Sequence, residues 1–232
     1  MKKLTSVIIA LSLALSAFGL ASCGSSADKN QVSVQETTSP TLVDEYGVGF
    51  NTDEDGSLTV SGYESNDTDV SIPDEFDGKP VKKIGRSAFK GQNIKTVTMP
   101  DGLEEIGDFS FALCSKLELV NIPDGVTKIG KNAFFANFAL TELELPESLQ
   151  LIEINAFNAS GLKEITIPEN VLNVGEYAFA DCVDLEQVQF MGDSTVVAAN
   201  AFKGCEKVGI IAPKGSPAID VAKENKLDYV EI

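Results

Sequence analysis

Three glutamates, Glu142, Glu144 and Glu164, lie close together in the sequence and are the residues best suited to acid–base chemistry. Most glycoside hydrolases use a pair of carboxyl groups as acid and base. One member of such a pair must be desolvated so that its pKa rises. Glu142 and Glu144 flank the apolar Leu143, a pattern that places both carboxylates on the solvated side of a strand. We therefore rank a carboxylate-based glycoside hydrolase below every non-catalytic function.

The composition excludes several other chemistries. The 232 residues include no histidine and no tryptophan, which excludes histidine-dependent catalytic triads, histidine general bases and histidine-containing zinc sites. Lysine and arginine number 18 against 35 aspartates and glutamates, giving a formal net charge of −17. Nucleic acid is not an expected partner, because clustered basic residues bind a phosphate backbone. We expect no cofactor and no metal.

A short acidic stretch is a second candidate for chemistry. Asn51, Asp53, Asp55 and Gly56 match the first half of a calcium-binding loop, in which alternate side chains face one ion. The twelfth position of that loop needs a bidentate glutamate and is Gly62 here. Asp-Gly between two strand-like segments is itself a strong hairpin signal. We therefore predict a polar hairpin turn at this place.

Three cysteines occupy one repeated position. Cys114, Cys182 and Cys205 each follow a regularly spaced phenylalanine by three residues. Other copies have Gln92, Asn137 and Ser160 at this position. A shared position predicts small buried side chains, and free cysteine often behaves as a small buried hydrophobic residue. Cys182 and Cys205 lie in adjacent copies, so a disulfide between them is the alternative that stays open.

The amino terminus has the features of a bacterial lipoprotein. Lys2 and Lys3 precede an apolar stretch, residues 4–20, as in a secretory signal peptide. The following Leu-Ala-Ser-Cys resembles a lipobox, which implies cleavage before Cys23 and a lipid on its thiol. Residues 24–41 are polar and predict a flexible tether.

From residue 72 onward the sequence repeats. A small residue followed by phenylalanine marks six copies spaced by 22 or 23 residues, at Phe89, Phe111, Phe134, Phe157, Phe179 and Phe202. An Ile-Gly step precedes the phenylalanine in several copies, as in Ile84-Gly85, and an alternating apolar run follows it, as in residues 119–122. A period of this length is typical of leucine-rich repeats and related solenoids.

Each alternating run predicts one short parallel strand per repeat. The runs contain Val97 and Met99, Val120 and Ile122, Leu143 and Leu145, Ile165 and Ile167, and Val188 and Phe190. Their outward positions form two columns. One column holds Thr96, Leu119, Glu142, Glu164, Gln187 and Ile210, and the other holds Thr98, Asn121, Glu144, Thr166, Gln189 and Ala212.

The middle of these columns is our candidate for a partner-binding face, because repeat proteins commonly bind partners on such an extended surface. The selected residues are Leu119, Asn121, Glu142, Glu144, Glu164 and Thr166. Phe135 and Phe138 lie outside the phenylalanine ladder. We favour additional core contacts for these two rings, with an exposed patch as the alternative.

The consensus Ile-Gly, Ala-Phe and Leu-x-x-Ile-x-Ile-Pro, at about 23 residues, resembles the BspA-like leucine-rich-repeat family of bacterial and protozoan surface proteins. The resemblance covers about residues 58–213. It implies a solenoid rich in short parallel strands, closed by an N-terminal β-hairpin. It also implies adhesion or contact with a host or matrix, without identifying a ligand.

The C-terminal segment predicts a cap. Ser216 as N-cap and Pro217 at the first helical position indicate a short helix over residues 217–225. Residues 227–232 then form a strand. The predicted organisation is a signal peptide (1–22), a lipidated tether (23–41), an N-terminal capping hairpin (42–80), leucine-rich repeats (81–212) and a C-terminal helix and strand cap (213–232).

These features predict a non-catalytic bacterial surface protein. We expect a monomer in the cell envelope, anchored to a membrane through lipidated Cys23 and exposed outside the cytoplasm. The expected partner is an extracellular protein or glycan. The alternative is a structural or accessory envelope lipoprotein that acts as a spacer or assembly partner.

Overall fold

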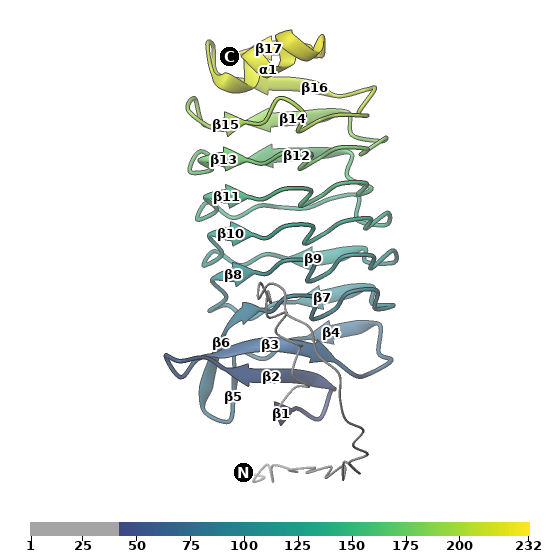
Figure 1. Cartoon of the computed structure of the whole chain (residues 1–232), viewed down its shortest axis with the longest axis vertical. Helices are drawn as coiled ribbons and strands as arrows, with labels where there is room; N and C mark the ends of the chain where they lie inside the picture. Colours follow the sequence, from purple (N-terminus) through teal and green to yellow (C-terminus); the bar gives the residue numbers. More distant parts are fainter. Residues whose placement is uncertain (1–41) are drawn as a thin grey trace, which may run out of the picture. The chain divides into compact units, whose positions relative to one another are not determined.

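The computed structural model describes residues 42–232, in which seventeen strands and one helix form a stack of similar coils (Figure 1). The predicted signal peptide (1–22) and the predicted tether (23–41), including Cys23, lie outside the described residues. The stack confirms the predicted leucine-rich-repeat solenoid. No helix in residues 42–232 is long and apolar enough to cross a lipid bilayer.

The largest sheet has ten strands and runs along one side of the stack (Figure 1). Its members are β1 (Leu42–Val43), β2 (Val48–Thr52), β3 (Leu58–Tyr63), β5 (Glu75–Phe76), β6 (Lys79–Ile84), β8 (Glu105–Ile106), β10 (Lys128–Ile129), β11 (Leu151–Ile152), β13 (Asn173–Val174) and β15 (Val196–Val197). β1 and β2, β2 and β3, and β5 and β6 pair antiparallel, whereas β3, β6, β8, β10, β11, β13 and β15 pair in parallel. The two-residue strands of the repeats coincide with the Ile-Gly steps. Each repeat thus has a second strand that sequence analysis missed, because two residues are too few to show alternation.

The predicted strands form two smaller sheets. The first contains β4 (Asp69–Ser71), β7 (Thr96–Thr98) and β9 (Leu119–Asn121). The second contains β12 (Glu164–Ile167), β14 (Gln187–Phe190), β16 (Gly209–Ala212) and β17 (Asp228–Glu231). All pairs in these two sheets are parallel.

Residues 142–145 lie between these sheets and form no strand, so the prediction of a strand there is wrong. Leu143 nevertheless faces the core, with 9% of its surface exposed. Glu142 follows Leu119 and precedes Glu164 in the outward column. Like charges at adjacent strand positions repel, which opposes regular pairing at this point.

Stacked phenylalanine rings form the centre of the core. Rings in neighbouring repeats, from Phe89 to Phe202, have centroids 5.0–5.7 Å apart and planes within 12° of parallel. Tyr63 extends the row at its N-terminal end, 5.5 Å from Phe89. Because each repeat places its ring on the previous one, the six Phe positions of the sequence become one continuous apolar column.

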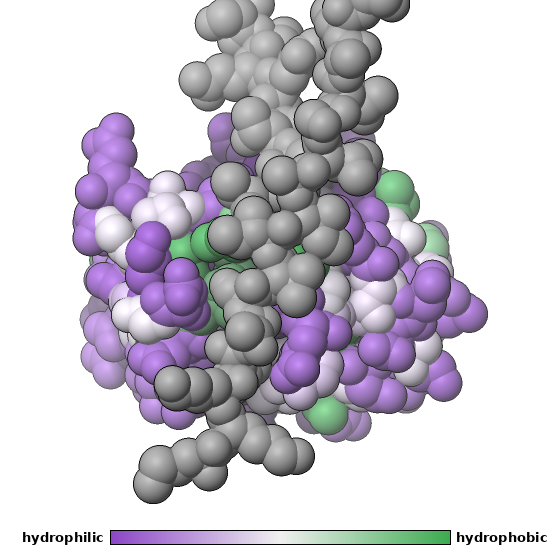
Figure 2. Space-filling view, turned by 90° about the horizontal axis from the view of Figure 1, so that it is seen from below, coloured by the Kyte–Doolittle hydropathy of each residue, from purple (hydrophilic) through white to green (hydrophobic). Residues whose placement is uncertain are grey.

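Both ends of the column are covered. At the N-terminal end Phe76 stacks on buried Phe50, with centroids 4.9 Å apart. Figure 2 looks onto this end and shows mainly hydrophilic residues around a smaller hydrophobic area on the surface left uncovered. At the other end the helix α1 (Pro217–Asn225) buries Ala218, Ile219, Val221 and Ala222.

The C-terminal cap confirms the predicted helix and final strand. Ser216 is the N-cap and Pro217 occupies the first turn of α1. The Ser216 hydroxyl makes no capping hydrogen bond and is buried without a partner. The N-cap assignment is therefore correct in position, while the expected side-chain contact is absent.

Candidate binding face

All six residues selected from the sequence lie on the same side of the stack and are exposed. Leu119 and Asn121 belong to β9, and Glu164 and Thr166 to β12. Glu142 and Glu144 belong to the irregular segment between these strands. We call these six residues the strand face. Their exposure follows from period-2 alternation, because Val120, Leu143 and Ile165 between them point into the core.

The pairing register of β14 and β16 shows that the predicted outward columns are wrong at their C-terminal end. Gln187 pairs with Gly209, and Val188 pairs with Ile210. Ile210 and Ala212 are therefore inward and fully buried, and were wrongly placed in the outward columns. The last repeat reaches its strand one residue sooner after Val208, which shifts the alternation by one position.

The three glutamates of the strand face carry unneutralised charge. Within residues 42–232, none of the ion pairs includes Glu142, Glu144 or Glu164. Several basic residues pair instead on the side of the ten-stranded sheet. These pairs are Lys82–Glu104 at 3.0 Å, Lys83–Asp53 at 3.4 Å and Lys128–Glu105 at 2.9 Å. The strand face therefore presents free carboxylates, hydroxyl and amide groups, and the exposed Leu119 side chain.

The geometry of the strand face does not resemble that of a glycosidase site. Its three carboxylates are exposed, and neither of the two hollows described below includes them. A catalytic acid needs an enclosure that removes water from one carboxyl group. The arrangement is suited to contact with a partner surface.

The acidic stretch near the N-terminus forms the predicted hairpin turn between β2 and β3. Gly56 has a φ of +86°, which glycine adopts without strain. Asp55 accepts hydrogen bonds from the backbone N–H and hydroxyl of Ser57, and Asp53 accepts one from Thr59. The carboxylates thus stabilise the turn itself. In the described part of the chain, no cluster of three or more acidic or cysteine side chains is arranged to hold a metal ion.

The repeated cysteine position is buried at all three cysteines, as predicted, and also at Asn137 and Ser160, whereas Gln92 is half-buried. In five of the six copies, the side chain at this position donates a hydrogen bond to the backbone carbonyl of the aromatic residue in the preceding repeat, whereas Ser160 shares a hydrogen bond of 3.3 Å with Cys182 Sγ. The bonds are Gln92 to Tyr63, Cys114 to Phe89, Cys182 to Phe157 and Cys205 to Phe179, at 3.0–3.2 Å. Asn137 does the same to Phe111 at 2.9 Å when its amide nitrogen faces the carbonyl. Every copy therefore has a side chain that can donate a hydrogen bond at this position, and no single residue type is needed.

Cys114, Cys182 and Cys205 are free thiols. Burial raises the pKa of Cys114 to about 12. The hydrogen bond between Cys182 and Cys205 raises the pKa of Cys205, with burial adding to the effect, and lowers the pKa of Cys182. The unpaired, buried state is the one that sequence analysis favoured.

The two additional phenylalanines differ from each other. Phe135 is half-buried, whereas Phe138 is 62% exposed. The favoured prediction of a core contact is therefore wrong for Phe138. Its ring lies in the loop before the strand face, where a residue absent from shorter repeats is inserted.

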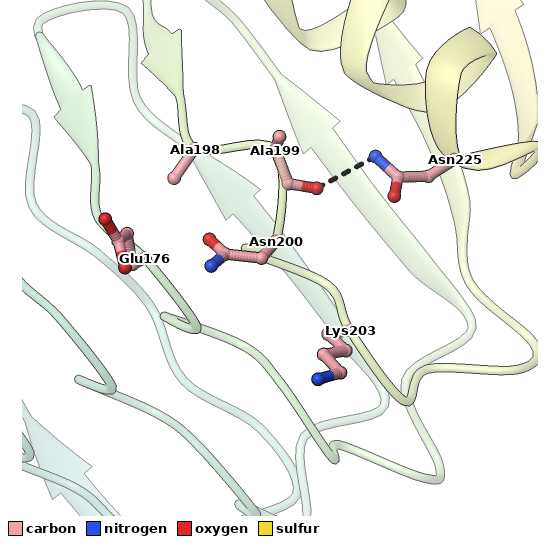
Figure 3. A pocket seen from close by; sticks show the side chains of 6 residues that line it. All are labelled: Glu176, Ala198, Ala199, Asn200, Lys203 and Asn225. Atoms are coloured by element: carbon pink, nitrogen blue, oxygen red, sulfur yellow. Dashed lines mark hydrogen bonds between the residues drawn. The ribbon is translucent and has the colours of Figure 1, made fainter.

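A hollow that the sequence did not predict lies at the C-terminal end of the stack. Its volume is about 620 Å³, and it lies between the last two repeats and the end of α1 (Figure 3). Its lining residues are Glu176, Ala198, Ala199, Asn200, Lys203 and Asn225. Phe202, Gly204, Cys205, Glu206 and Leu227 join Lys203 and Asn225 around a smaller adjacent hollow of about 280 Å³. In the sequence, the indication of this hollow is that Val197-Ala198 replaces the Ile-Gly step found in most of the other repeats.

The parallel strands, stacked phenylalanines and terminal caps define the class of protein as a leucine-rich-repeat solenoid. The sequence model of the BspA type leucine-rich repeat region matches residues 82–209 in six copies. The chain therefore belongs to the BspA-type leucine-rich-repeat family. Among curated proteins, none matches this sequence.

Several solved structures resemble the chain. A leucine-rich repeat protein from Bacteroides ovatus is 37% identical with a TM-score of 0.65, over 73% of this chain and 46% of that protein. The T. pallidum leucine-rich repeat protein is 22% identical with a TM-score of 0.62, over 82% and 97% of the two chains. The pneumococcal vaccine antigen PcpA is 24% identical with a TM-score of 0.61, over 82% and 49%. The latter two support the fold alone. The chain spans about half the length of the Bacteroides protein and of PcpA.

Proposed function

We propose that this protein is a non-catalytic, lipid-anchored bacterial surface protein that binds an extracellular protein or glycan through the strand face. The observation that carries the proposal is the exposure of Glu142, Glu144 and Glu164 on one side of the stack without basic partners. Free carboxylates beside hydroxyl and amide groups suit a partner that offers cations or hydrogen-bond donors. Membership of the BspA-type family supports a location at the bacterial surface.

Binding of the immobilised full chain to a panel of purified matrix proteins and glycans tests the proposal. We expect saturable binding that the triple substitution Glu142→Gln, Glu144→Gln and Glu164→Gln weakens at least about tenfold, since several charge-assisted contacts are lost. A matched triple variant, Glu64→Gln, Glu153→Gln and Glu169→Gln, removes the same charge from glutamates that also make no ion pair in the described chain, and it should bind normally. Equal binding by both variants would overturn the assignment of the strand face.

The anchor has its own test. Mass spectrometry of the mature protein should find Cys23 at the amino terminus with a lipid on its thiol. An unmodified Cys23, or cleavage at another residue, would contradict this part of the proposal. In a pull-down with the soluble protein, recovery of only envelope proteins from the same species would favour the alternative role as a spacer or assembly partner.

A further inference from the structure

The hollow beside α1 exists because the last repeat departs from the others at one position. The residue two places after the conserved Ile or Val of the Ile-Gly step is large or charged in the first five repeats and small in the sixth. The series is Arg86, Asp108, Lys131, Ile154, Glu176 and Ala199. Since Ala199 ends at a methyl group, nothing from the last repeat fills the space above Glu176 (Figure 3).

The backbone also changes at this place. In four earlier pairs of repeats, an N–H donates to the carbonyl of the next repeat, as Asn155 does to Glu176 O at 3.0 Å. The corresponding bond from Tyr177 N–H to Ala199 O is not formed in the described chain. Ala199 O instead accepts a hydrogen bond from Asn225 Nδ2 at 2.9 Å, drawn in Figure 3. Asn225 of α1 thus holds Ala199, which lines one side of the hollow, and takes the carbonyl to which the Tyr177 N–H would otherwise donate.

Opposite charges border the hollow without neutralising each other. Glu176 and Lys203 are both exposed, and neither takes part in any ion pair within residues 42–232. The Lys203 ammonium instead lies over the Tyr177 ring, 5.7 Å from its centroid, and has no carboxylate partner in this part of the chain. Figure 3 shows their side chains on two sides of the space, with the Asn200 amide between them. Asn225 Nδ2 also donates to Val221 O at 3.0 Å, so the Asn225 amide is held and its Oδ1 remains an acceptor. The hollow therefore offers an anion, a cation and two amide groups around a small apolar floor.

We propose that this hollow binds a small zwitterionic ligand of the amino-acid class. Its ammonium group contacts the Glu176 carboxylate, and its carboxylate contacts the Lys203 ammonium, with Asn200 accepting or donating between them. One ligand of zero net charge then gives each of these two residues an oppositely charged partner. A volume of about 620 Å³ accommodates such a molecule. The site is open to water, so binding is expected to be weak, in the millimolar range.

Titration of the ¹⁵N-labelled full chain with L-alanine, followed by NMR, tests the proposal. We expect saturable shifts of the backbone amides of Tyr177, Asn200 and Lys203. Glu176→Gln and Lys203→Gln should each weaken binding at least about fivefold. Glu147→Gln and Lys163→Gln, which change the same charges at exposed positions outside the hollow, should leave L-alanine binding unchanged. Ala199→Leu should abolish binding by filling the hollow, while thermal unfolding confirms that each variant is folded.

Three results would overturn the proposal. Methylamine or acetate producing the same saturable shifts as L-alanine would indicate simple ion binding. Methyl glucoside binding in place of L-alanine would indicate a sugar site. The absence of saturable shifts at about 100 mM L-alanine would indicate no site at all. The triple variant of the strand face should still bind L-alanine, which separates this inference from the proposed function.

Discussion

The ring of Phe134 lies on the ring of Phe157 with centroids 5.4 Å apart and planes only 3° from parallel. Both side chains are fully buried. Each ring in the middle of the row contacts one ring above and one below, so a single position contributes to two repeat interfaces. Nearest-neighbour contacts of this kind set the stability of a solenoid.

Replacement of Phe134 by alanine should destabilise the protein by about 3–5 kcal/mol, because it removes a buried ring and leaves a cavity between two others. Urea unfolding followed by circular dichroism measures the loss. The exposed Phe138 in the same repeat is the matched control, and Phe138→Ala should change stability by less than about 0.5 kcal/mol. Similar losses for both variants would contradict the stacked-ring core.

Gly161→Ala should be destabilising, by about 1–3 kcal/mol, because an added Cβ would collide with the backbone oxygen of Phe138. Gly102→Ala should instead stabilise by about 0.4–1 kcal/mol. Its nearest neighbour would be Val81 O at 4.0 Å, and the substitution restricts the unfolded chain. Thermal unfolding of the two variants should therefore shift in opposite directions.

Asn137→Leu should destabilise by about 2–4 kcal/mol, because Phe111 O and Phe135 O both lose a buried donor. Asn137→Cys should be milder, by about 1–2 kcal/mol, since a thiol donates at this position in other repeats. Equilibrium unfolding compares the variants. If leucine were tolerated as well as cysteine, the donor requirement at this position would be wrong.

The pKa of Cys114 makes stability depend on pH in the alkaline range. In the unfolded chain this thiol ionises near its ordinary pKa of 9.0, whereas in the folded protein the pKa is about 12. Between these values the unfolded state binds fewer protons, so the contribution is complete below pH 9 and is lost as pH rises towards 12. The slope is about 1.4 kcal/mol per pH unit. The difference in unfolding free energy between the parent and Cys114→Ser, measured from pH 8 to 11, isolates this thiol. A pH-independent difference would contradict it.

Much of the fold was predictable because the same short sequence pattern recurs in every repeat, although each single occurrence is weak evidence. One Ala-Phe pair means little, but six at constant spacing predict the stacked rings from Phe89 to Phe202. The helix at Pro217 followed from local capping chemistry. The exposure of Glu142, Glu144 and Glu164 followed from alternation with buried residues.

Other features depend on contacts between repeats and were not readable from one copy. The second strand at each Ile-Gly step is defined by hydrogen bonds to its neighbours. The shifted register of Ile210 arises from a shorter path in the last repeat. The hollow at Glu176 forms only because Ala199 and Asn225, from different elements, meet there.

The uniform stacking of the phenylalanine rings has a consequence for how such a protein changes in evolution. Every internal repeat offers nearly the same surface above and below, so duplication or loss of one 22- or 23-residue unit leaves the remaining interfaces intact. The gene can therefore lengthen or shorten the molecule in steps of about 4.8 Å. The outward-facing residues of each repeat can change without disturbing the core, so the length of the solenoid and the chemistry of its surface can evolve separately.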